Sequence, residues 1–237
     1  MSRRWTTIFA VGLLIVLLAS LTLVGYFAWV AGLDKFISAV ASMGASLIVA
    51  PILHELGHFF VAKANKMECV LIKCFCFCYK KTDEKWSLTL VSPFAPDQTQ
   101  VLPKTSENMQ KRAIRYTLGG LLTEGGFCLL IAITAIIFAC FGVATFSLWG
   151  LLPYCAYLFI LNAVPLEYPD GKTDALIALG IKKDYPAEKT MVAAMYIQGK
   201  LSEGYSFGEI EENYYFDLPQ LCEDEPLFAV MLDLRYR

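Results

Sequence analysis

Long apolar runs with few charges alternate with shorter polar stretches over the first 170 residues of the chain. Four such runs extend over residues 7–31, 36–65, 113–144 and 147–166. A helix of about 20 residues is about 30 Å long, which is the thickness of the hydrocarbon core of a bilayer. The first run is uncharged and longer than the apolar region of a signal peptide, so we expect it to be retained. The pattern predicts four transmembrane helices.

The composition supports a membrane protein. Hydrophobic residues make up 57 % of the chain, charged residues 18 %, and the mean hydropathy is +0.51. Soluble domains have about a quarter charged residues, so this chain is unusually apolar. A net charge of −2 provides no basic excess for binding nucleic acid, and the expected partner is the lipid bilayer. We therefore expect an all-α polytopic membrane protein.

Lysine and arginine are distributed unevenly between the connections of the predicted helices. Ten of them lie between residues 63 and 115, whereas the loops near Asp34 and Gly142 hold one lysine between them. Positively charged connections stay on the cytoplasmic side of a membrane. We therefore expect both termini and the long connection to be cytoplasmic, in a multi-pass protein of a bacterial cell membrane.

The chain changes character beyond residue 171. Residues 181–237 carry a net charge of −5, and apolar residues recur at helical spacing between Met191 and Ile197. We interpret residues 176–237 as a small, acidic, helical cytoplasmic tail, which leaves room for a cytoplasmic protein partner. The preceding segments are then a first transmembrane helix over 1–35 and a core over 36–175.

Both histidines of the chain lie in one short motif, His54-Glu55-Leu56-Gly57-His58. Residues four apart share one face of a helix, so both imidazoles can bind the same cation. Glu55 then lies close enough to take a proton from a water that the metal activates. Polar groups at membrane depth are costly and usually functional. The motif therefore predicts a Zn²⁺ site with His54 and His58 as ligands and Glu55 as the catalytic base.

A catalytic zinc site usually has three protein ligands, and the histidines supply two. The acidic candidates follow the fourth apolar run, on the same predicted membrane face: Glu167, Asp170 and Asp174. A regular helix through residues 167–174 would place all three on nearly one side. Helical geometry therefore leaves the third ligand open.

HExxH in a hydrophobic segment, followed by N-x-x-P-x-x-x-x-D-G whose Asp170 lies 112 residues after His58, resembles the site-2 protease family of intramembrane zinc metalloproteases. The resemblance extends over about residues 36–175, and we expect a small member without a PDZ domain. It implies that Asp170 is the third zinc ligand and that Asn162 polarises or positions the scissile carbonyl. It also implies an endopeptidase that cleaves membrane-embedded or membrane-docked protein segments near the cytoplasmic face.

Two other classes use the same ligands: a metal-binding membrane transporter and a non-catalytic scaffold. Transporters usually carry polar residues along several helices and often contain an internal repeat. Here the candidate ligands cluster at one end of the predicted helices and no repeat is visible, which favours the protease. The intact Glu55 argues against a scaffold.

One element departs from the family pattern. Family members often carry G-P-x-x-N between the two motifs, whereas this chain has Leu121 at the proline position and Glu124 at the asparagine position. Two interpretations of this intramembrane carboxyl stay open: it contacts the active site, or it is protonated and hydrogen-bonded between helices.

The long connection contains two strand-like runs, residues 70–79 and 86–91, on either side of the polar stretch 80–85. We expect a membrane-associated β-hairpin within about residues 68–103, as the family resemblance implies. Cys74, Cys76 and Cys78 alternate along the first run and would line one face of a strand. Their spacing suits no common zinc motif, so we interpret them as apolar filling.

Overall fold

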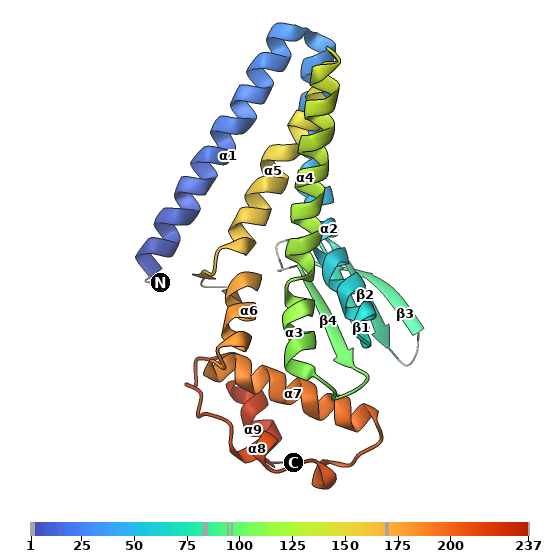
Figure 1. Cartoon of the computed structure of the whole chain (residues 1–237), viewed down its shortest axis with the longest axis vertical. Helices are drawn as coiled ribbons and strands as arrows, with labels where there is room; N and C mark the ends of the chain where they lie inside the picture. The colour runs from blue at the N-terminus through green and yellow to red at the C-terminus, as the bar shows by residue number, and fades with distance from the viewer. Residues whose placement is uncertain (1–2, 83–84, 94, 96, 169–170, 237) are drawn as a thin grey trace. The chain divides into compact units, whose positions relative to one another are not determined.

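The computed structural model describes residues 3–82, 85–93, 95, 97–168 and 171–236. Its described part is mostly helical, with one four-stranded and one two-stranded sheet (Figure 1). The chain divides into two compact units, each built from two segments. The first is Met1–Gly57 with Gly120–Asp174, and the second is His58–Gly119 with Ala175–Arg237. Each unit thus combines parts that are distant in the sequence.

Four helices are long and apolar enough to cross a membrane, as the hydrophobic pattern predicts: Arg4–Ala31, Leu33–Ala64, Met109–Cys140 and Phe146–Ala163. They correspond to α1 (Arg3–Ala31), α2 (Leu33–Ala64), α3 (Met109–Thr117) followed by α4 (Gly119–Cys140), and α5 (Phe146–Ala163). After α5 the first unit ends in a short hairpin of β5 (Glu167–Tyr168) and β6 (Gly171–Lys172).

Glycines set two features of the first unit. Gly32 has φ +137°, a backbone conformation that side chains rarely adopt, and it ends α1 directly before α2 begins. Gly150 of α5 lies against α2, where an added Cβ would come within 2.6 Å of the carbonyl oxygen of Ala39. Close approach of this kind lets membrane helices associate through van der Waals contact. That contact matters in a membrane because lipid is itself apolar, so there is no hydrophobic driving force between the helices. The packing of α5 against α2 thus depends on a residue without a side chain.

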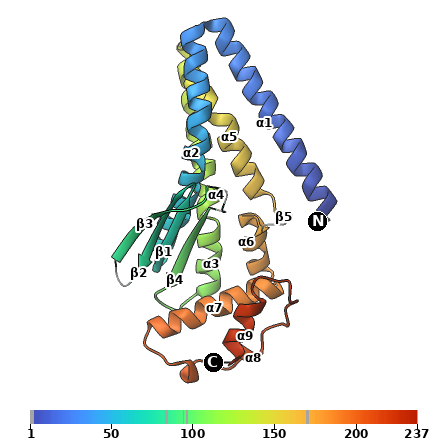
Figure 2. The ribbon, with the colours of Figure 1, turned by 180° about the vertical axis from the view of Figure 1, so that it is seen from behind.

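The second unit contains an antiparallel sheet in the order β3-β2-β1-β4, so β3 and β4 form its edges (Figure 2). The strands are β1 (Met67–Cys74), β2 (Phe77–Thr82), β3 (Lys85–Leu90) and β4 (Gln98–Pro103). β1 pairs with β2 through Leu71 and Lys80, and with β4 through Met67 and Pro103. β2 and β3 form the antiparallel pair that was predicted across the polar stretch, with Thr82 opposite Lys85, but β1 and β4 extend this pair to four strands, which the prediction of a single hairpin did not include.

The run over residues 70–79, which was expected to be one strand, is divided between β1 and β2. Phe75 has φ +54°, and β1 ends directly before it. The carboxylate of Asp97 accepts the backbone N–H of Phe75 at 2.7 Å and the ammonium of Lys73 at 3.0 Å. This long-range partner stabilises the turn. Cys74 and Cys78 consequently lie on different strands, and the expected row of three cysteines on one strand is absent from the described sheet.

The rest of the second unit is helical: α6 (Asp174–Lys182, whose first residue belongs to the first unit), α7 (Pro186–Ser202), a 3₁₀ turn (Phe207–Glu209), α8 (Asn213–Phe216) and α9 (Phe228–Tyr236). Helix α7 packs against α3 and β4 as well as against α8 and α9. Val192 and Met195 of α7 cover the buried side chains of Ala62, Met67 and Met109. The acidic tail is therefore part of the same core as the sheet.

Arg112 of α3 fastens three backbone segments of this unit to one another. Its buried guanidinium donates to the carbonyl oxygens of Asn65 and Lys66 at 2.7 Å, and also to that of Thr105. Buried polar groups are costly unless they are hydrogen-bonded, so these bonds hold the end of α2 beside the loop before α3.

Candidate metal centre

The HExxH motif lies on α2, one turn beyond Pro51. Pro51 lacks a backbone N–H, which removes one bond from the helical ladder just before the motif. His54, Glu55 and His58 are all buried, although α2 as a whole is apolar and exposes many of its side chains. Ionisable groups are rare in apolar spans and usually mark a functional site, and this helix buries three of them within five residues.

Asp174, the first residue of α6, supplies an oxygen to the two histidines. One ligand atom from each of His54, His58 and Asp174 lies within 4.8 Å of the other two. Nε2 of His54 is 3.1 Å from a carboxylate oxygen of Asp174. His58 lies one turn beyond His54 on the same unbroken helix. Two nitrogens and one carboxylate oxygen are donors that suit Zn²⁺ and several other divalent ions, so this group could hold a metal ion.

The hairpin before α6 determines where Asp174 lies. The hydroxyl of the buried Thr173 accepts the backbone N–H of Leu166 at 3.0 Å and donates to the carbonyl of Val164 at 2.9 Å. The backbone N–H of Thr173 also donates to the carbonyl of Leu166. These three bonds close the base of the β5–β6 hairpin directly before Asp174, so the carboxylate projects from a fixed backbone.

Both imidazoles are oriented through their Nδ1 atoms. Nδ1 of His54 is 3.2 Å from a carboxylate oxygen of Glu124 in α4, and Nδ1 of His58 is 2.9 Å from the backbone carbonyl oxygen of Tyr116 in α3. For His58 this acceptor places the proton of the neutral ring on Nδ1, whereas both nitrogens of His54 face carboxylate oxygens, so its ring proton lies on Nδ1 when Nε2 binds a metal. The lone pair of Nε2 is then left for a metal on both histidines.

The tyrosine that holds His58 is itself fixed by the second unit. The ring of Tyr116 lies 5.4 Å from that of His58, and its hydroxyl donates to the carbonyl of Thr99 in β4. The Tyr116 side chain also packs against the core that α7 covers. The orientation of His58 therefore depends on packing between α3, β4 and the tail.

The other acidic candidates fall into different positions. Asp170 lies outside the described residues, so its assignment as the third ligand stays a prediction. Glu167 is exposed on β5 and does not belong to the group formed by the described residues around His54 and His58. Asp174, one of the alternatives that helical geometry left open, is the acid that lies beside the histidines.

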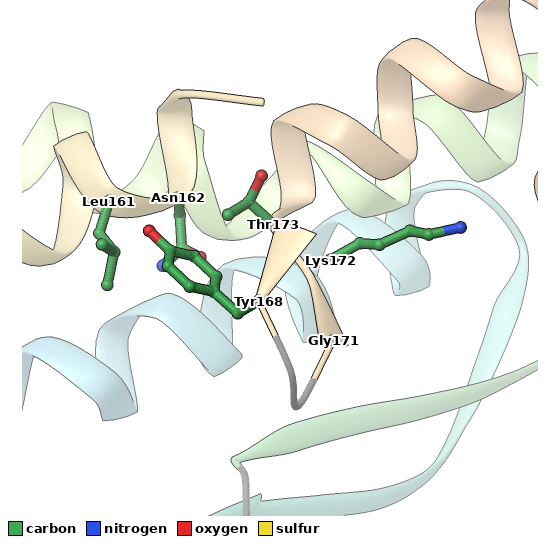
Figure 3. A pocket seen from close by; sticks show the side chains of 6 residues that line it. All are labelled: Leu161, Asn162, Tyr168, Gly171, Lys172 and Thr173. Atoms are coloured by element: carbon green, nitrogen blue, oxygen red, sulfur yellow. The ribbon is translucent and has the colours of Figure 1, made fainter. Parts of the chain in front are cut away.

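Asn162 lies at the end of α5 and lines a pocket of about 300 Å³ together with Tyr168, Lys172 and Thr173 (Figure 3). Its amide donates to the carbonyl of Leu158 at 3.3 Å, a weak bond within its own helix. The ring of Tyr168 lies beside the Asn162 side chain, whereas Lys172 points away from it (Figure 3). The Asn162 amide therefore lines the pocket beside the β5–β6 hairpin.

Tyr168 carries a buried hydroxyl for which the described residues provide no hydrogen-bond partner. Burial raises the pKa of this phenol, so it stays protonated and able to donate. Sequence reasoning had not singled out Tyr168. The one signal for Tyr168 in the sequence is its place inside the N-x-x-P-x-x-x-x-D-G motif. A tyrosine after a membrane helix is not a signal by itself, because tyrosines are common at the lipid–water interface.

No family model, curated protein or solved structure matches the chain. The donor groups and their geometry are therefore what supports a functional interpretation.

Proposed function

We propose that the protein is an intramembrane metalloendopeptidase of the site-2 protease type, which cleaves membrane-embedded or membrane-docked protein segments near the cytoplasmic face. The observation that carries the proposal is the group of the buried His54 and His58 with the half-buried Asp174, together with the buried Glu55 in the motif of the histidines. Peptide hydrolysis needs a metal with an open position, a base and access for an extended chain. The first two requirements have candidates among the buried residues.

The proposed roles follow from the donor set. His54, His58 and Asp174 would hold a divalent metal, with Zn²⁺ as the ion that suits them best. When bound, such a metal acts as a Lewis acid and lowers the pKa of water. The Glu55 carboxylate takes the proton of the attacking water and returns it to the amine that leaves when the C–N bond breaks. Asn162 is the proposed group that polarises the scissile carbonyl, from the wall of the neighbouring pocket.

The third ligand is proposed as Asp174, with Asp170 as the competing assignment. Asp174 is supported by its distance of 3.1 Å from His54, and Asp170 by the spacing of the N-x-x-P-x-x-x-x-D-G motif. Asp174→Ala and Asp170→Ala, purified in detergent and analysed for bound zinc, distinguish them. We expect Asp174→Ala to lose about one zinc per chain, as His54→Ala does. Full retention by Asp174→Ala together with loss by Asp170→Ala would transfer the role to Asp170.

Glu55→Gln tests the catalytic role directly. We expect bound zinc to be unchanged and cleavage to fall by about a hundredfold to ten-thousandfold, because the base is removed while the ligands remain. The measurement uses fluorescently tagged single-span peptides reconstituted with the protein in vesicles. Glu68→Gln is the matched control, since it removes a carboxylate from β1, outside the metal-ligating group. Cleavage by Glu55→Gln at the wild-type rate would refute the mechanism.

The same vesicles separate the protease from the two other classes. A transporter would move Zn²⁺ across the membrane, and a scaffold would bind metal without either flux or cleavage. We expect cleavage without flux.

The proposed orientation places both termini and residue 80 in the cytoplasm, and Asp34 and Gly142 outside. Single cysteines at these positions, in a chain lacking its native thiols, can be labelled with a membrane-impermeant reagent in intact cells. We expect labelling at 34 and 142 only, because the positive connections are retained inside. Labelling at position 80 from outside would reverse the orientation.

A further inference from the structure

Two carboxylates approach opposite edges of the His54 ring. Asp174 lies 3.1 Å from Nε2, and Glu124 lies 3.2 Å from Nδ1. The two ring nitrogens point in different directions, so a metal held by Nε2 and Asp174 is on the far side of the ring from Glu124. Glu124 is accordingly not a member of the group His54, His58 and Asp174. Glu124 is therefore a second carboxylate, on the Nδ1 side of the His54 ring.

Glu124 is almost completely buried, with 1 % of its surface exposed, near the start of the apolar helix α4. A carboxylate in such surroundings is costly unless it is paired or hydrogen-bonded. Glu124 and His54 belong to the same compact unit, where Nδ1 of His54 lies 3.2 Å from this carboxylate, within reach for a ring N–H to donate to it. The contact favours the first of the two interpretations that the sequence left open, in which Glu124 contacts the active site.

We propose that Glu124 is the positioning residue of His54, an inference that rests on the proposed metal site. Its carboxylate accepts the Nδ1–H, fixes the tautomer and the ring orientation, and makes Nε2 a stronger donor. Carboxylate–histidine–metal arrangements of this kind typically contribute about tenfold to a hundredfold to metal affinity. Glu124 does not belong to the group that could hold the metal, so its proposed effect on the metal runs through the histidine.

His58 provides the internal comparison. Its Nδ1 lies 2.9 Å from a neutral backbone carbonyl, that of Tyr116, one residue before the end of α3. A carbonyl fixes the tautomer as a carboxylate does, but it brings no negative charge to the ring. The two ligands therefore differ in donor strength, and His54 is the one whose donor strength depends on a side chain.

The test measures metal affinity in the full-length protein in detergent, by competition for Zn²⁺ with a chromophoric chelator. Glu124→Leu removes the acceptor, and Glu124→Gln keeps an acceptor oxygen without the charge. We expect Glu124→Leu to bind Zn²⁺ about ten to a hundred times more weakly than wild type, with Glu124→Gln in between. Ser46→Ala is the matched control, because it removes an equally buried polar group from α2 that donates to the carbonyl of Met43. The control should bind as wild type does.

The absorption spectrum of bound Co²⁺ provides a readout that a general loss of stability would not produce. We expect the ligand-field bands to shift in Glu124→Gln and to stay in place in Ser46→Ala, since only the former alters the hydrogen bond to a metal ligand. Unchanged affinity and spectrum in both Glu124 variants, in a protein whose metal binding requires His54, would overturn the positioning role and leave the metal site standing. A wild-type protein that binds neither Zn²⁺ nor Co²⁺ would overturn the proposed function as well.

Discussion

Ile197 of the second unit and Leu129 of the first are both large aliphatic side chains on helices, but Ile197 is 1 % exposed and Leu129 is 61 % exposed. The same difference appears in the clusters of buried side chains. The three clusters of buried hydrophobic residues among the described residues all belong to the second unit. In the first unit, buried positions include Ser46, His54 and Glu124, while many leucines and isoleucines are exposed.

The two units therefore solve the burial of apolar surface in different ways. The second unit has an interior of its own, as a domain in water must have. The first unit exposes apolar side chains, which are stable where the surrounding solvent is itself apolar. A lipid bilayer around the long helices would be such a solvent. Polar groups collect inside the first unit because that is the place where they find protein partners.

The largest expected effect comes from emptying the core of the second unit. Ile197→Ala should lower the free energy of unfolding by about 2–5 kcal/mol, because it removes buried methyl groups and leaves a cavity. Leu130→Ala is the matched change in the first unit, where the side chain is exposed, and it should cost only about 0.5 kcal/mol. Denaturant midpoints of the two variants in the same detergent measure the difference. Equal effects would contradict the distinction between the units.

A charged substitution at an exposed apolar position should also affect the two units differently. Leu129→Asp should oppose membrane insertion by about 2.5–3.5 kcal/mol if the residue faces the hydrocarbon core. Phe216→Asp, at a position that is 60 % exposed in α8, should change stability by less than about 0.5 kcal/mol, because water already surrounds it. The membrane-bound fraction in a reconstituted insertion assay is the measurement. Normal insertion of Leu129→Asp would remove the argument that lipid covers α4.

Features that depend on local spacing could be predicted from the sequence. The four long helices follow from runs of about 20 apolar residues, because every backbone group in lipid must be bonded within the helix. The histidine pair follows from the four-residue spacing on α2. In each case, the sequence neighbours alone determine the structure.

Features that depend on distant partners could not. The turn at Phe75 is held by Asp97, 22 residues away, so one expected strand became two. The choice of Asp174 depends on how Thr173 closes a hairpin, which no helical periodicity describes. The contact between His54 and Glu124 joins residues 70 positions apart, and the sequence left it as one of two possibilities. Tertiary contacts decided each of these points.

The smallest expected effect concerns the acid sensitivity of the second unit. Glu203 follows α7, and its carboxylate accepts the backbone N–H of Ser106 at 2.9 Å. Hydrogen bonds from the Thr105 hydroxyl and from the Ser106 backbone hold the pKa of Glu203 below its usual value. The native state therefore binds this proton more weakly than the unfolded chain does, so the carboxylate stabilises the fold above its unfolded pKa of about 4.3. That stability is lost as the pH falls from there through the lowered native value.

Glu203→Gln removes this dependence without changing the shape of the side chain. We expect wild type to melt at a higher temperature than the variant near neutral pH, and the difference to shrink towards zero as the pH falls below about 4. The effect should be smaller than that of Ile197→Ala, because the Glu203 side chain is 27 % exposed and water competes for its hydrogen bonds. Melting temperatures of both proteins across this pH range, in one detergent, provide the comparison. A difference that stays constant with pH would mean that the carboxylate charge plays no part in holding α7 to the loop before α3.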